Sequence, residues 1–209
     1  MCTSSCEGAI PGSGLGQFEA PVGVAVDPLT QDVYVIDGLL DRIDEFTATG
    51  KPIRYFGSVG SGNGEMDNPA GGFAFDPATN QLLLADTVNN RVEAFTPSGK
   101  FAGTFGSSGA GDGEFDTPIA VAVAPNGDIY VSDAANNRIE QFNRSKAFIA
   151  AWGAGVSNGA DQAEICTSSC RAGVETGIDG GFSGPGDSQS IRRTGAYTSP
   201  TSATSESSA

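Results

Sequence analysis

The sequence predicts an all-β protein made of repeated four-stranded units, and three observations lead to this fold class. A motif that begins near Pro21 is written three times, and its arginine stands at Arg42, Arg91 and Arg138, at intervals of 49 and 47 residues. Short runs rich in Val, Ile and Phe alternate with turn residues. Over most of the chain, the 30 glycines and 11 prolines fall at these turns. Repetition at this period indicates an array of supersecondary units.

Each unit contains four predicted strands, which is the number of strands in a propeller blade. The strands of the first unit are expected at residues 22–26, 33–36, 42–46 and 52–56. Residues 22–26 are a nearly continuous apolar run, typical of a strand buried on both faces. The second unit has its strands at 73–75, 82–85, 91–95 and 101–105, and the third at 120–124, 129–132, 138–142 and 148–152. The glycine-rich stretches between units are predicted to be turns from one unit to the next.

The repeats divide the chain into six segments. Residues 1–17 are a loop rich in Cys, Gly and Ser, and the three units cover 18–57, 62–106 and 111–153. Residues 154–185 form a longer connection and the start of a fourth unit near Phe182. Residues 186–209 are rich in Ser and Thr, a composition typical of a disordered segment.

The tail carries a further hypothesis, because the repeat stops abruptly after Pro185. If the codons of residues 188–209 are read one base out of frame, they permit a strand, an Asp-Pro turn, a second strand that ends in Asp, and an Arg-Val pair. These are the parts of a fourth unit in their proper order. We therefore hypothesise that residues from about 186 onward are frameshifted coding sequence, with an unstructured linker as the alternative.

Composition and charge exclude several classes of function. The formal net charge is −14, with 25 acidic and 11 basic residues, which argues against nucleic acid and an acidic membrane surface as partners. No apolar run has the roughly 20 residues that a membrane helix needs, and no signal peptide is visible. Because the chain has no histidine, it lacks the commonest general base and the commonest transition-metal ligand.

The four cysteines lie in two copies of the motif Cys-Thr-Ser-Ser-Cys. An even number of cysteines in polar loops favours a disulfide within each copy, which suggests an extracellular or cell-surface location. A metal site with four thiolates from both copies is the weaker alternative. The disulfide candidates are Cys2, Cys6, Cys166 and Cys170.

Acidic and basic residues recur together in each unit. Recurrence favours a structural network, in which each arginine pairs with the aspartate of the preceding strand, over an anion-binding site. The expected pairs are Asp37 with Arg42, Asp86 with Arg91 and Asp133 with Arg138. Asp27 and Asp76 precede prolines and are expected to form Asx turns, with calcium binding as a minor alternative. No catalytic residue, metal site or cofactor is predicted.

The pattern G-x-G-x-F-x-x-P-x-G-V-A-V-D-P, followed by D-V-Y-V-x-D and R-I-x-x-F, resembles the NHL repeat over residues 14–153. The resemblance implies a β-propeller segment with three complete NHL-type blades and a broken fourth. Because no unit-specific set of carboxylates or other catalytic residues is found, the predicted function is a non-enzymatic scaffold for a protein or glycan partner outside the cell. The alternatives are a piece of a calcium-dependent propeller hydrolase or lactonase, and a truncated product without independent function. Open blade edges are expected to allow self-association.

Overall fold

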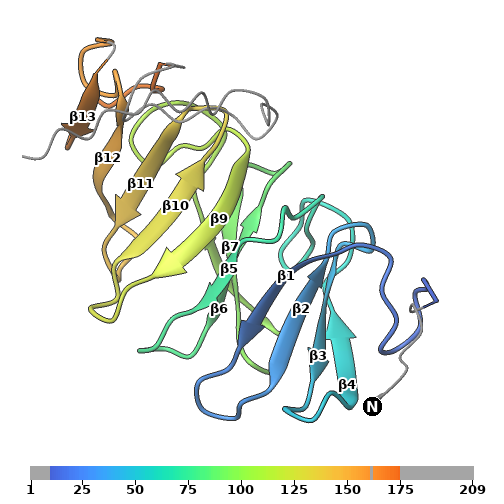
Figure 1. Cartoon of the computed structure of the whole chain (residues 1–209). Helices are drawn as coiled ribbons and strands as arrows, with labels where there is room; N and C mark the ends of the chain where they lie inside the picture. The colour runs from blue at the N-terminus through green and yellow to red at the C-terminus, as the bar shows by residue number, and fades with distance from the viewer. Residues whose placement is uncertain (1–9, 161, 175–209) are drawn as a thin grey trace, which may run out of the picture.

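The part of the protein that the structure describes folds as three antiparallel sheets that follow one another along the chain (Figure 1). The computed structural model describes residues 10–160 and 162–174, and this part of the chain contains strands and no helix. It therefore includes no helical segment with the length and apolar character of a membrane span. The all-β fold class is confirmed.

Each sheet is a blade built from consecutive strands. Blade 1 contains β1 (Pro21–Val26), β2 (Val33–Asp37), β3 (Arg42–Phe46) and β4 (Pro52–Phe56). Blade 2 contains β5 (Phe73–Phe75), β6 (Leu82–Asp86), β7 (Arg91–Phe95) and β8 (Phe101–Phe105). Blade 3 contains β9 (Pro118–Val123), β10 (Ile129–Asp133), β11 (Arg138–Phe142), β12 (Phe148–Ala154) and β13 (Ala163–Cys166).

The strand pairing repeats from blade to blade in its details. The second and third strands of each blade pair without a shift in register, so Asp37 lies opposite Arg42 and Asp133 lies opposite Arg138. The register shifts between the third and fourth strands, and the shift falls just before Phe46, Phe95 and Phe142. Because the register shift falls at the same repeat position, the three blades share one pattern of strand pairing. β13 is the exception, since no sequence repeat predicted a fifth strand on the outer edge of blade 3.

Two apolar cores lie between neighbouring blades. The core between blades 1 and 2 joins Tyr34, Ile36 and Ile43 to the side chains of β5, β6 and β7. The core between blades 2 and 3 is built at the same repeat positions. The linker before each later blade adds one fully buried side chain to these cores, namely Met66 and Phe115.

The first strand corrects one expectation. Residues 22–26 were predicted to be buried on both faces, but Val24 is 67% exposed, and Val22 and Val26 are also exposed. Ala25 points the other way and packs against the core between blades 1 and 2. The reason is tertiary, because within the described residues no sheet covers the other face of blade 1.

Some predictions lie outside the described residues. These are the disulfide between Cys2 and Cys6, the start of a fourth unit near Phe182, and the frameshift hypothesis for 186–209.

The buried linker side chain gives a test of how the blades stack. Phe115→Ala should lower the free energy of unfolding by about 3–5 kcal/mol, because it leaves a cavity between blades 2 and 3. Phe18→Ala is the matched control, since Phe18 stands at the same repeat position but is only partly buried against Phe46. Urea denaturation measures both variants. Equal losses would contradict the assignment of Phe115 to a joint between blades.

Candidate functional site

The three linker loops gather at one end of the sheets. Because the strands are antiparallel, the first strand of each blade begins, and the second strand ends, at the same edge. The linkers at residues 10–20, 57–72 and 106–117 therefore lie beside the turns at 38–41, 87–90 and 134–137. Backbone hydrogen bonds join the two sets, such as Val88 N–H to the Asp67 carbonyl and Ala134 N–H to the Thr117 carbonyl. We call this end the loop face.

One arginine per blade holds the linker in place, and it is buried in blades 1 and 3 and partly buried in blade 2. Arg138 is fully buried, and its guanidinium donates to the carbonyls of Ala110 at 2.7 Å, Gly111 at 2.9 Å and Glu114 at 2.7 Å. Arg91 binds Ser61, Gly62 and Glu65 in the same way, and Arg42 binds Ser13, Gly14 and Gln17. The glycine-rich stretches are thus linkers whose backbone carbonyls accept hydrogen bonds from an arginine guanidinium.

In blades 2 and 3 the arginine also contacts the aspartate of the preceding strand. The Nε atom of Arg91 lies 2.8 Å from Asp86, and that of Arg138 lies 2.8 Å from Asp133. An asparagine two residues before each arginine, Asn89 or Asn136, donates to the same carboxylate and to a linker carbonyl.

Blade 1 departs from the expected pairing of Asp37 with Arg42. Arg42 contacts Asp44 instead, at 2.8 Å from Nε. The carboxylate of Asp37 accepts four backbone N–H groups, from Glu19, Ala20, Leu39 and Leu40. The physical reason lies at the position of the asparagine, which is Leu40 in this blade, so no side-chain amide draws the carboxylate toward the arginine.

The four N–H groups also set the charge of Asp37. Burial alone would raise its pKa, but the hydrogen bonds from the backbone outweigh burial and hold the pKa below its usual value.

Two buried glutamates complete the network and were not predicted from the sequence. Glu93 lies 2.9 Å from Arg91, and Glu140 lies 2.8 Å from Arg138. Neither oxygen of Glu140 has a hydrogen-bond partner of good geometry. Burial raises the pKa of Glu93 to about 7 and that of Glu140 to about 8, although the arginines oppose the shift. The repeated Arg-x-Glu spacing was the available signal, because residues i and i+2 of a strand share a face.

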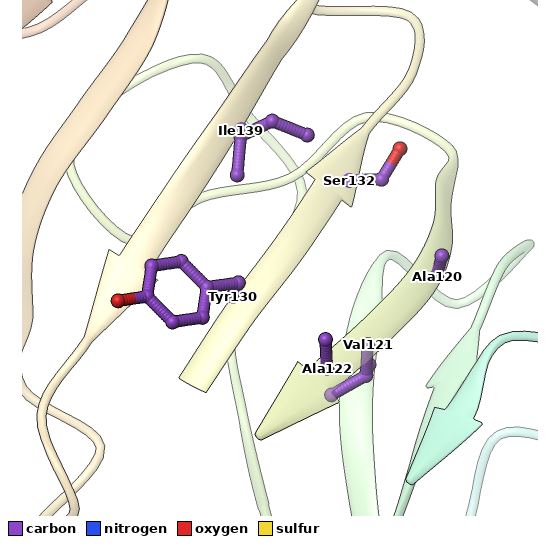
Figure 2. Close-up of a pocket in the computed structure, with 6 residues that line it drawn as sticks. All are labelled: Ala120, Val121, Ala122, Tyr130, Ser132 and Ile139. Atoms are coloured by element: carbon purple, nitrogen blue, oxygen red, sulfur yellow. The ribbon is translucent and has the colours of Figure 1, made fainter. Parts of the chain in front are cut away.

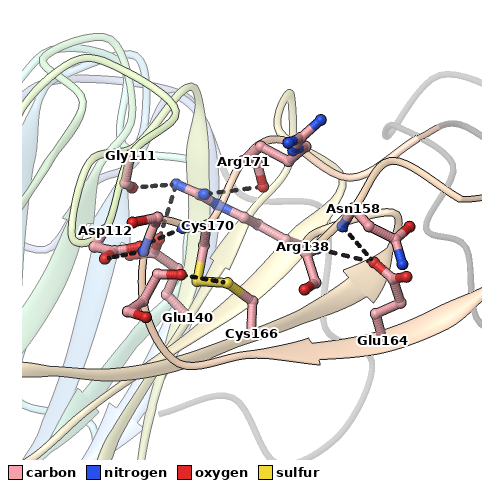
Figure 3. The surroundings of a disulfide bond; sticks show 12 residues. Gly111, Asp112, Arg138, Glu140, Asn158, Glu164, Cys166, Cys170 and Arg171 are labelled. Carbon is pink, nitrogen blue, oxygen red and sulfur yellow. Dashed lines mark hydrogen bonds and ion pairs between the residues drawn. A yellow bond between two sulfur atoms is a disulfide. The ribbon is translucent and has the colours of Figure 1, made fainter.

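The second cysteine motif forms a disulfide between Cys166 and Cys170 (Figure 3). The N–H groups of Ser169 and Cys170 donate to the carboxylate of Asp112, at 2.8 and 2.7 Å. Asp112 belongs to the linker held by Arg138, which also donates to the Arg171 carbonyl at 3.2 Å. The disulfide loop is therefore attached to the loop face.

The aspartates considered for calcium have local partners. Asp27 accepts the N–H groups of Leu29 and Thr30, and Asp76 accepts that of Ala78, as in Asx turns. Within residues 10–160 and 162–174, no three His, Cys, Asp or Glu side chains lie close enough together to hold a metal ion.

Comparison with known proteins supports the resemblance noted in the sequence. Residues 115–142 match the NHL repeat family. No curated protein matches the chain in sequence. Similar solved structures include a protein of unknown function from Bacteroides thetaiotaomicron, 18% identical, covering 78% of this chain and 40% of that one with a TM-score of 0.53.

Two further structures show the same architecture. The WD40 repeats of RRP9 are 12% identical, with 68% of this chain and 40% of that chain covered and a TM-score of 0.53. A chain of the nidogen–laminin complex is 19% identical, with 73% and 54% covered and a TM-score of 0.51. At these identities the likeness shows the fold alone, which is that of a β-propeller, and the chain spans about half the length of these structures or less.

The raised pKa values predict how stability depends on pH. Between about pH 4.5 and 8 the folded state binds more protons at Glu93 and Glu140 than the unfolded state does. Their contribution to stability is therefore complete below this window and falls as the pH rises, by up to about 1.4 kcal/mol per pH unit for each group. Glu140→Gln should match the wild type near pH 5 and exceed it at pH 8.

Urea denaturation at several pH values measures this difference, with the exposed Glu19→Gln as the control. The interpretation fails if the Glu140→Gln variant and the wild type keep the same pH slope.

Proposed function

We propose that this chain, with its propeller fold and NHL repeat, is a non-enzymatic scaffold that binds a protein partner through the loop face. The observation that supports this most is the arginine network, in which each guanidinium fixes a linker through three carbonyls. Loops held by a rigid scaffold are the usual place for binding residues. Three such loops side by side form a preorganised surface.

The charge of the loop face indicates a basic partner. Glu19 and Asp116 are exposed there, and Asp41 and Asp67 are partly exposed. The lysines of the described residues lie in the turns between third and fourth strands, at the opposite end, and are Lys51, Lys100 and Lys146. Arg171 is the exposed basic residue of the attached disulfide loop, so acidic side chains still outnumber basic ones on the loop face. This excess of negative charge would steer a positively charged segment toward the linkers.

Aliphatic side chains at the tips of two turns favour a protein over a glycan. Leu39 is 67% exposed and Val88 is 52% exposed, and both occupy the same repeat position on neighbouring blades. Apolar side chains in the middle of a polar surface are typical of protein–protein contacts.

The buried ionisable groups support binding over catalysis. Asp86 and Asp133 recur with the same linker N–H, asparagine and arginine partners, so their positions are explained by the fold. We further propose that the protein works in an oxidising compartment such as the extracellular space, because a disulfide between Cys166 and Cys170 persists there.

The proposal is tested by selecting peptides from a random library on the immobilised 209-residue chain. Selected peptides should combine Lys or Arg with apolar residues, and their affinity should fall as salt rises. The double variant Leu39→Ser/Val88→Ser should weaken binding by about tenfold or more, since it removes the exposed apolar contacts.

Leu29→Ser is the control, because Leu29 is also an exposed aliphatic residue but lies in a turn at the opposite end of blade 1. Peptides without basic residues, or equal binding by both variants, would contradict the proposal. Binding to a glycan array in place of peptides would also contradict it.

A further inference from the structure

The joint between neighbouring blades is made twice in this chain from the same repeat positions. Each blade presents a forward face to the next blade and a back face to the previous one. The forward face uses Tyr34, Ile36 and Ile43 in blade 1, and Leu83, Ala85 and Val92 in blade 2. The back face uses Phe73, Leu82, Leu84 and Phe95 in blade 2, and Val121, Ile129, Val131 and Phe142 in blade 3.

The forward face of blade 3 is open within the described structure. Tyr130, Ser132 and Ile139 hold the repeat positions of Tyr34, Ile36 and Ile43. With the neighbouring β9 they line an open apolar hollow of about 200 Å³ (Figure 2). Figure 2 shows the Tyr130 ring and the Ile139 side chain beside this hollow.

The back face of blade 1 is also open. Its repeat positions are filled by Val24, Val26, Val33, Val35 and Phe46. In blades 2 and 3 the equivalents of Val24 and Val26 pack against the preceding blade, whereas here Val24 is 67% exposed and Val26 is 49% exposed. Phe18, the equivalent of the buried Met66 and Phe115, lies on the same blade against Phe46.

We propose that the forward face of blade 3 binds the back face of blade 1 in a second copy of this chain. The open forward face of blade 3 and the open back face of blade 1 present the repeat positions that pack together between blades 1 and 2 and between blades 2 and 3. A second copy is therefore a partner that offers the same repeat positions as the faces that pack together in these two joints. This surface is separate from the loop face, so the proposal does not depend on the binding function above.

The geometry of repetition gives the size of the assembly. Each copy contributes the three blades of its described residues, so two copies joined head to tail bring together six blades, which is within the range of closed propellers. Both joints between the copies are then identical, so the assembly closes as a two-fold ring and does not extend into a fibre.

The proposed joint between copies differs at one residue from the two joints within the described chain. A Cβ at Gly23 would overlap the Gly71 carbonyl of the next blade, and a Cβ at Gly72 would overlap the backbone of Ala120. The equivalent position on the forward face of blade 3 is Ala120 itself. Its methyl group should hold the inner strands of this joint slightly farther apart, so Ala120→Gly should lower the dissociation constant several-fold.

Sedimentation equilibrium of the full 209-residue chain tests the proposal. The expected species is a dimer of about 42 kDa, twice the chain mass of 21.2 kDa. Val24→Glu or Ile139→Glu should each weaken dimerisation by about a hundredfold or more, because a charge enters an apolar joint. Val59→Glu is the control, since Val59 is exposed in the linker between blades 1 and 2. Circular dichroism confirms that each variant is folded.

Mixing the two variants distinguishes a dimer with head-to-tail joints from a dimer formed through other surfaces. In a mixed dimer one joint carries both glutamates and the other carries neither, so the mixture should regain dimers that neither variant forms alone. The proposal is overturned by a monomer at all concentrations, by loss of the dimer in only one of the two variants, or by a ladder of species beyond the dimer.

Discussion

The guanidinium at the start of each third strand, and its hydrogen bonds to the linker, are the interaction on which the rest of the structure depends. Each linker must run from the outer edge of one blade to the inner strand of the next, and its carbonyls need partners. Arg138 supplies three of them from a fully buried position. A planar guanidinium with five fixed donors suits this task, whereas a lysine offers a single point charge. The stacking of the blades and the shape of the loop face both follow from this contact.

The same network contains more acidic than basic groups. In blade 3 one guanidinium lies between Asp133 and Glu140, and in blade 2 one lies between Asp86 and Glu93. Two carboxylates cannot both be neutralised by one cation, so the glutamate without well-directed hydrogen bonds keeps its proton most readily. The contacts between arginine and carboxylates fix the position of each linker, but burying these charged groups costs stability, as is common for buried ionic groups.

The repeat in the sequence predicted most of the fold, because strand positions depend on local alternation and turn residues. Strands such as Arg91–Phe95 have the predicted bounds. What could not be predicted depends on contacts between distant segments. The exposure of Val24 depends on which faces are covered, and β13 belongs to no repeat. The partner of Arg42 changed because Leu40 replaces an asparagine. Hydrogen bonds of this kind are visible only once the linker is placed beside the sheet.

The fifth strand of blade 3 changes how that blade meets solvent. β13 pairs along β12, from Ala151 with Cys166 to Ala154 with Ala163, whereas β4 and β8 are the last strands of their sheets. Unpaired strand edges are templates for pairing with other chains, and a very short edge strand such as β13 makes such pairing less favourable. The disulfide at the end of β13 closes a local loop, and its two cysteines pack against Ala151 of β12. Over Ala151–Ala154, the amide hydrogens of β12 are therefore shielded from exchange on both sides, unlike those on the outer edges of β4 and β8.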